Sequence, residues 1–116
     1  MKLSLSVDEF GRLVCAVDDG SSPVIVTSST PDAAGDLAEA ARDALESGAG
    51  ECFWTEGCGE YRWMLRRNGD SLRVVVLWST GTMTGWEHVL WAECPAGDFL
   101  AQVEAEAAKL PARTAR

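Results

Sequence analysis

Four cysteines and a single histidine are the residues of this chain whose types could do chemistry. Cys52, Cys58, His88 and Cys94 could supply three thiolates and one imidazole, a donor set that suits a structural zinc ion. Five residues separate Cys52 from Cys58 and five separate His88 from Cys94, whereas zinc knuckles separate their paired ligands by two to four. The spacing therefore argues against a metal site, and we expect no metal and no cofactor.

The same residues allow a nucleophilic pair or a disulfide to be drawn. His88 could activate Cys58 or Cys94, and Cys52 could bridge to Cys58. The chain contains no Gly-x-Ser-x-Gly elbow, no phosphate-binding Gly-Lys-Ser/Thr loop and no dinucleotide fingerprint. We expect a protein that is not an enzyme, with a small enzyme or metal-binding protein that uses Cys58, His88 and Cys94 as an alternative.

The N-terminal residues predict a hairpin and a third strand. Apolar and polar side chains alternate through residues 3–8, and a loop at 9–11 turns the chain back. A short β-branched strand is predicted at residues 24–27, directly after Pro23. The hairpin register pairs Val7 with Leu13, Leu5 with Cys15 and Leu3 with Val17, so Cys15 is predicted to be a core residue.

Two helices are predicted, each following a proline. The first begins at Ser29-Thr30-Pro31, with a hydroxyl cap and Pro31 in the first helical position, and it ends at Gly48. The second begins within residues 94–98 and ends at Pro111. Its apolar stripe consists of Phe99, Val103, Ala107 and Leu110.

Residues 60–93 predict a three-stranded meander whose first turn is Asn68-Gly69. That turn places Leu65 opposite Leu72, Trp63 opposite Val74 and Tyr61 opposite Val76, all on a core face that Trp78 continues. The opposite face mixes guanidinium groups with apolar side chains: Arg62, Met64, Arg66, Arg73, Val75 and Leu77.

The third strand of the meander, residues 86–93, has an ambiguous orientation. We favour an inward Val89 and Trp91 on side-chain volume, which leaves His88 and Leu90 on the arginine-bearing face.

Three strands followed by a helix occur twice, in residues 2–47 and 60–110. This order, βββα–βββα, predicts a two-layer α+β sandwich: one antiparallel sheet of about six strands with both helices on one face. The Gly-rich connection at 48–59 carries Phe53 and Trp54, which are predicted to fold over an edge of the core or to form a short strand. We expect one domain over residues 1–111 and a flexible tail at 112–116.

Charge is spread unequally along the chain, whose formal net charge is −8. Residues 1–59 carry eleven acidic and three basic side chains, whereas residues 60–116 carry seven of each. An acidic field repels phosphate backbones, so nucleic acid is not an expected partner. No apolar run is long enough to cross a membrane and no secretory signal is evident at the N-terminus, so a bacterial-type cytoplasm is the expected location.

The segment from Gly59 to Leu110 resembles a group of small, mostly uncharacterised actinobacterial-type α+β proteins. The resemblance is carried by residues 59–63 (GEYRW), 73–77 (RVVVL) and 92–95 (AECP), together with Phe99. Some proteins of this kind resemble immunity proteins, which neutralise a neighbouring toxin. The resemblance implies a binding protein without a cofactor, and it carries no catalytic residues.

The expected function is therefore protein binding, in which one face of the sheet masks the surface of a partner. The candidate partner-binding residues are the mixed set Arg62, Met64, Arg66, Arg73, Val75 and Leu77, because arginine and methionine are enriched at interfaces. A homodimer formed through the same open face is the alternative. RNA is disfavoured because Tyr61, Trp63 and Trp78 are predicted on the other face, out of reach of a stacked base.

Overall fold

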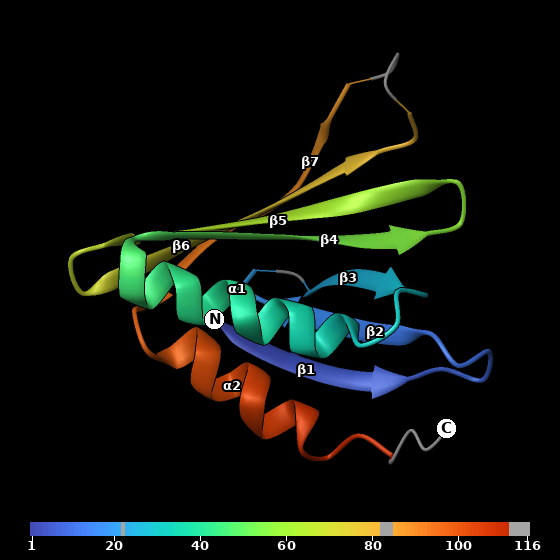
Figure 1. Cartoon of the computed structure of the whole chain (residues 1–116), viewed down its shortest axis with the longest axis horizontal. Coiled ribbons are helices and arrows are strands. Elements are labelled where there is room, and N and C mark those ends of the chain that lie inside the picture. The colour runs from blue at the N-terminus through green and yellow to red at the C-terminus, as the bar shows by residue number, and fades with distance from the viewer. Residues whose placement is uncertain (22, 82–84, 112–116) are drawn as a thin grey trace.

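Two antiparallel sheets and two helices make up the fold (Figure 1). The computed structural model describes residues 1–21, 23–81 and 85–111, so the predicted tail at 112–116 lies outside the described residues. The first sheet consists, in spatial order, of β1 (Lys2–Val7), β2 (Leu13–Asp18) and β3 (Pro23–Ser28). The second consists of β4 (Ala49–Glu56), β5 (Gly59–Asn68), β6 (Ser71–Ser79) and β7 (Glu87–Pro95), and the helices are α1 (Ala33–Ser47) and α2 (Asp98–Ala107).

The chain is α+β, but the prediction of one sheet of about six strands is wrong. The Gly-rich connection forms a full strand, β4, so the element order is βββα–ββββα and the strands divide between two sheets. Cys52 and Trp54 of β4 point into the core while Phe53 between them is exposed. This alternation is that of a half-buried strand, the second of the two predicted possibilities.

The two sheets meet at one junction, where the ends of β3 and β4 approach each other. The Ser29 amide donates to the Thr55 carbonyl over 3.0 Å, and the Ser28 hydroxyl donates to the same oxygen. α1 packs mainly on the second sheet (Figure 1). A Cβ atom on Gly50 of β4 would lie 1.9 Å from the Ala40 carbonyl oxygen, so the absence of a side chain permits this approach.

α2 lies along β1 and blocks its free edge. The Leu3 amide donates to Oε1 of Gln102 over 2.7 Å, and the Leu5 amide donates to Oε1 of Glu106 over 3.1 Å. By accepting these two hydrogen bonds, the side chains of α2 satisfy backbone N–H groups of β1 that could otherwise pair with a further strand. The helices therefore cover different sheets, rather than one face of a single sheet as predicted.

The predicted β1–β2 register is confirmed, and Cys15 is fully buried. The start of α1 differs from the prediction, because the helix begins at Ala33 and not at Pro31. The Thr30 hydroxyl is used elsewhere: it accepts the Thr55 amide of β4 over 2.7 Å. The predicted end of α1 is confirmed, since Gly48 adopts a left-handed conformation with a φ of 98°.

The β5–β6 turn lies one residue later than predicted, which shifts every pairing partner by two residues, so Trp63 is opposite Val76 and Leu65 is opposite Val74. The two loop residues are Gly69 and Asp70, and Gly69 at φ 63° occupies the first loop position, as in a type II′ turn. Because side chains alternate with a period of two, this shift leaves every residue on its predicted face.

The favoured orientation of the last strand is wrong. In β7, Leu90 and Ala92 are buried, whereas Trp91 is 49% exposed and lies opposite Val75. A bulge beside Val76 and Leu77 changes the alternation, so His88 and Trp91 share the outer face although an odd number of positions separates them. Alternation is regular from Leu90 to Pro95, so the choice made on side-chain volume selected the wrong one of the two possible faces for these residues.

The core joins both sheets and both helices. The Trp54 and Trp63 rings lie 5.0 Å apart on the inner face of the second sheet, and Phe99 of α2 packs 6.2 Å from Trp63. Phe99 and Val103 are buried and Ala107 is half-buried, as predicted, but α2 ends at Ala107 and not at Pro111, so the half-buried Leu110 lies beyond the helix. Within the described ranges, neither helix is long and apolar enough to cross a membrane.

Candidate functional site: the outer face of the β4–β7 sheet

The side of the second sheet that faces away from the core is here called the outer face. Alternation along the strands places all six predicted binding residues on it, as register pairs Arg62–Leu77, Met64–Val75 and Arg66–Arg73. β4 and β7 add further residues at the sides. The outer face also includes Glu51, Phe53, His88, Trp91 and Glu93.

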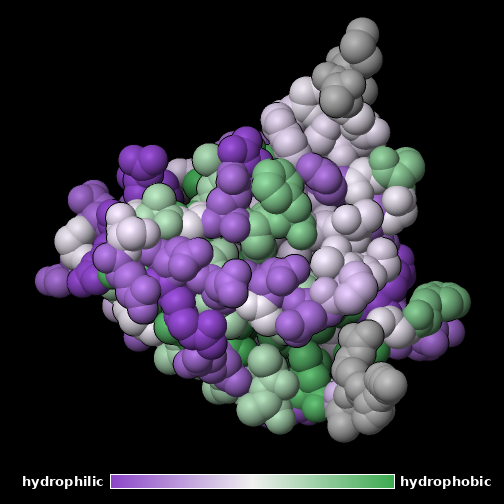
Figure 2. Space-filling view, in the orientation of Figure 1, coloured by the Kyte–Doolittle hydropathy of each residue, from purple (hydrophilic) through white to green (hydrophobic). Residues whose placement is uncertain are grey.

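Large apolar side chains are concentrated on this face. Six are exposed among the described residues, and four of them belong to or border the outer face: Phe53 (43%), Met64 (37%), Trp86 (42%) and Trp91 (49%). In Figure 2, green residues over the second sheet stand among purple and pale ones, above the mostly hydrophilic band formed by the outward side of α1. Exposed apolar side chains gathered on one face mark an interaction surface more often than scattered single residues do.

Arginines stack on the aromatic rings of the outer face. The Arg62 guanidinium lies 5.7 Å from the centre of the Phe53 ring and 5.8 Å from that of Trp86. The Arg73 guanidinium lies 5.3 Å from the centre of the Trp91 ring. These cation–π contacts hold both guanidinium groups in place beside apolar surface.

Acidic neighbours neutralise the arginines unequally. Arg62 forms an ion pair with Glu51, and Nε of Arg73 lies 3.6 Å from Oε2 of Glu93. Arg66 has no ion pair within the described part of the chain. The positive charge on the face is therefore concentrated at Arg66, near Arg73.

A groove of about 670 Å³ opens beside this charge. Its walls come from β4 to β7 and from α1, and they combine apolar with charged side chains. The volume is in the range of ligand pockets in proteins. The lining residues that bear on recognition are Asp43, Glu51, Met64, Arg66, Arg73 and Trp91.

The residues proposed for enzymatic or metal chemistry are not brought together. Cys58 lies in the exposed turn between β4 and β5, whereas Cys94 is buried opposite Leu72, near the other end of the sheet. The intervening length of β6 spans roughly 20 Å. His88 is on the outer face and Cys94 on the inner face.

The buried thiols are also poorly suited to act as thiolates. Burial raises the pKa of Cys15 and that of Cys52 to about 12, and burial also raises the pKa of Cys94. Because the thiolate is the nucleophile and the metal ligand, these groups are in their unreactive form near neutral pH. All four cysteines are free, including Cys52 and Cys58, and no metal-binding cluster occurs over the described ranges.

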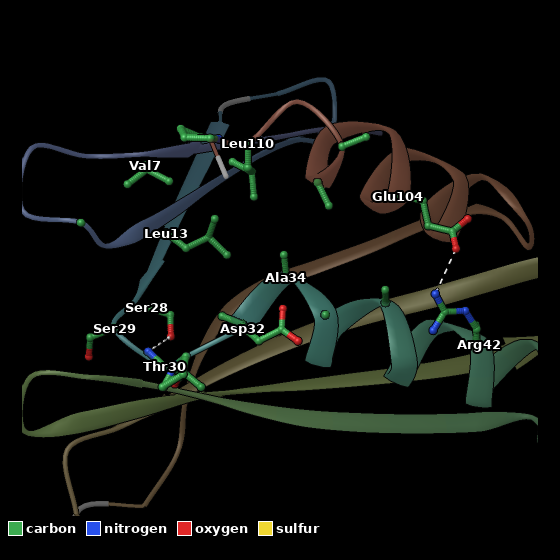
Figure 3. A pocket seen from close by; sticks show the side chains of 18 residues that line it. Val7, Leu13, Ser28, Ser29, Thr30, Asp32, Ala34, Arg42, Glu104 and Leu110 are labelled. Atoms are coloured by element: carbon green, nitrogen blue, oxygen red, sulfur yellow. Dashed lines mark hydrogen bonds and ion pairs between the residues drawn. The ribbon is translucent and has the colours of Figure 1, made fainter. Parts of the chain in front are cut away.

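A second cleft, of about 870 Å³, lies between the β1–β2 hairpin and the two helices (Figure 3). Leu13, Ala34 and Leu110 line it, and the Arg42–Glu104 ion pair, 3.1 Å long, joins the two helices at one end. The buried Ser28 hydroxyl already donates to Thr55 and accepts the Thr30 amide. The cleft thus offers mainly aliphatic contacts, with its charged pair and its buried hydroxyl already satisfied.

The sequence reasoning missed three aromatic residues of the outer face, namely Phe53, Trp86 and Trp91. A signal for Phe53 existed, because it alternates with Cys52 and Trp54 as in a half-buried strand. Trp91 was assigned to the core by volume, whereas its register position opposite Val75 and its exposure place it on the outer face. The argument that aromatic residues avoid the arginine-bearing face is therefore wrong.

Comparisons with protein-family models, with curated proteins and with solved structures found no match for this chain.

Proposed function

We propose that this chain is a non-enzymatic protein-binding domain whose outer face masks part of a partner's surface. The observation that carries the proposal is the concentration of exposed Phe53, Met64, Trp86 and Trp91 on one side of a sheet whose other side forms the core. Masking is also the mode of action that the resemblance to immunity proteins implies.

The chemistry of the face suits a protein partner. Aromatic residues, methionine and arginine are the residue types enriched at interface centres. The stacked Arg62 and Arg73 are held against rings before any partner arrives, so less side-chain entropy is lost on binding.

A protein fits the face better than a nucleic acid does. Two of the three arginines already lie near glutamates, which leaves little charge for a phosphate backbone. The formal net charge of −8 repels a polyanion further. The aromatic rings provide stacking area, but affinity for nucleic acid depends mainly on neutralising phosphates.

Site-specific photo-cross-linking in the organism that encodes the chain tests the proposal. A photoreactive phenylalanine analogue is placed at Phe53, at Trp91 and, as a control, at Ile25. Ile25 is a matched control because it is 53% exposed on β3, in the other sheet. Mass spectrometry then identifies each adduct, and calorimetry measures the affinity of the purified partner.

We expect one discrete adduct from Phe53 and Trp91 and none from Ile25. The Trp91→Ala variant should bind the purified partner roughly 30-fold less tightly, as for an interface hot spot of about 2 kcal/mol. Absence of adducts at both outer-face positions would contradict the proposal. Adducts formed only with a second copy of the chain would contradict the proposal and support the homodimer instead.

A further inference from the structure

Two arginines face each other across neighbouring strands of the outer face. Arg66 of β5 is directly opposite Arg73 of β6 in the antiparallel register. Side chains in such positions start about 4.5–5.5 Å apart at Cβ, and like charges placed there destabilise a sheet. The pair is therefore costly to the free protein unless an anion compensates it.

The chain's own acids compensate the pair only in part. Glu93 lies 3.6 Å from Nε of Arg73, which is too long for a hydrogen bond, and this buried Nε–H has no acceptor among the described residues. Arg66 has no ion pair in the same described ranges. A buried donor without an acceptor is unfavourable and needs an explanation. One positive charge and one buried N–H thus remain to be satisfied.

The surroundings of the pair favour a small, singly charged anion attached to an apolar group. Both arginines line the groove of about 670 Å³, with Trp91 and Met64 as apolar neighbours. The ring of Trp91, 5.3 Å from the Arg73 guanidinium, shields one side of that group from water. Electrostatic attraction is stronger where water is partly excluded.

We propose that Arg66 and Arg73 together receive the carboxylate of one Asp or Glu side chain of the partner, whose apolar neighbours pack on Trp91 and Met64. A guanidinium binds a planar carboxylate through two parallel hydrogen bonds, and the terminal Nη groups supply the donors here, because Nε of Arg73 is buried while the side chain as a whole is 43% exposed. This inference rests on the proposed function and names the chemistry of its anchor.

A carboxylate fits the groove better than a phosphate does. Asp43 and Glu51 also line the groove, and they repel a dianion more strongly than a monoanion. The formal net charge of −8 acts in the same direction. The partner supplies this carboxylate from a surface of its own, and a second copy of the chain is a distinct outcome of the test.

Selection from a random peptide library displayed on phage tests the inference with a defined probe. Purified full-length wild type should enrich peptides that carry an acidic residue beside apolar residues. In a synthetic copy of the best peptide, replacing that acidic residue by its amide should weaken binding about tenfold or more, because charge-assisted hydrogen bonds are lost.

The matched variants are Arg66→Gln/Arg73→Gln and Arg42→Gln. In the double variant, the same change in the peptide should no longer weaken binding, whereas Arg42→Gln should retain the full effect because Arg42 lies on α1 and pairs with Glu104. Arg66→Gln alone, which removes no ion pair, serves if the double variant does not fold. It should lose at least part of the peptide's acid dependence.

The failures can be told apart. Enrichment of apolar peptides without an acid, still lost in Trp91→Ala, would overturn the carboxylate anchor and leave the proposed function intact. Peptides that bind without any dependence on Trp91, or no enrichment at all, would overturn both. A wild-type dimer that Arg66→Gln/Arg73→Gln dissociates in light scattering would overturn the heterologous partner in favour of a second copy.

Discussion

The inner and outer faces of the β4–β7 sheet are built from alternate residues of the same strands, yet their central aromatic residues differ in environment. Trp54 and Trp63 on the inner face are fully buried. Phe53, one residue from Trp54, and Trp91 are nearly half exposed. The difference shows that the tryptophan-rich composition of this region serves two purposes, a core on one side and an uncovered surface on the other.

The comparison also separates residues that should govern stability from residues that are proposed to bind a partner. Inner residues contact both helices and the other sheet, so changing them disturbs the whole core. Outer residues contact mainly each other and solvent, so a change there leaves the core intact. The predictions below test this separation, beginning with the largest expected change in the free energy of unfolding.

Trp63→Ala should destabilise the protein by about 3–5 kcal/mol, because it leaves a cavity in a fully buried site. Trp91→Ala on the outer face should cost less than about 1 kcal/mol, since the removed ring is half exposed. Chemical denaturation of both variants measures the two values. Equal losses would show that the outer face is part of the structural core.

Gly50→Ala should destabilise the protein by about 1–3 kcal/mol or more, because the new Cβ overlaps the backbone of α1. Gly97→Ala is the matched control, since a Cβ there meets no atom within 4 Å and the backbone φ is −85°. Thermal or chemical unfolding of the pair checks the result. A neutral Gly50→Ala would mean that α1 does not approach β4 as closely as described.

Two buried indoles on the inner face should respond differently to loss of their N–H. The Trp54 indole donates to the Ala33 carbonyl over 3.1 Å, whereas the buried Trp63 indole nitrogen has no partner within the described ranges. Trp54→Phe should therefore cost about 1 kcal/mol more than Trp63→Phe in the free energy of unfolding. The reverse order would indicate that Trp63 has an acceptor.

Low pH should weaken the hydrogen bond through which Glu106 of α2 covers the edge of β1. A hydrogen bond from Lys109 and one from the Leu5 amide lower the pKa of Glu106 below its ordinary value of 4.5. A carboxyl group with a lowered pKa in the folded state stabilises the fold above its ordinary pKa. That contribution is lost as the pH falls through the lower folded value.

The measurement is the pH dependence of unfolding in wild type and in Glu106→Gln, between neutral pH and the acid limb. The variant should be less stable near neutral pH, and the difference should shrink as acid protonates Glu106 in the wild type. A difference that stays constant over the acid limb would show that the Glu106 charge does not support the edge.

Much of the fold was accessible from local patterns. Alternation predicted the β1–β2 register and the faces of β5 and β6. The faces are correct even though the β5–β6 pairing is shifted by two residues, because side chains alternate with a period of two. The split into two sheets was not accessible, since β3 and β4 belong to separate sheets and meet at their ends, where Ser28 and Ser29 donate hydrogen bonds to Thr55. These groups are far apart in sequence and carry no periodic signal.

The candidate site was predicted in part. The six mixed residues share the predicted face, but the aromatic residues that make this face unusual were assigned elsewhere or left undecided. Trp91 was missed because side-chain volume was used to choose between the two possible faces of β7, whereas the smaller Leu90 and Ala92 are the buried residues. Phe53 was left between two possibilities because glycines at both ends of residues 48–59 resemble a loop.

The affinity and the stability of Trp91→Ala should be measured beside those of Ile25→Ala, using the partner identified by cross-linking. Both residues are about half exposed, and they lie on different sheets. We expect Trp91→Ala to lose about tenfold or more in affinity while its free energy of unfolding changes by less than about 1 kcal/mol, and we expect Ile25→Ala to bind normally. Unchanged affinity of Trp91→Ala, or equal losses in the two variants, would contradict the proposed binding role of the outer face.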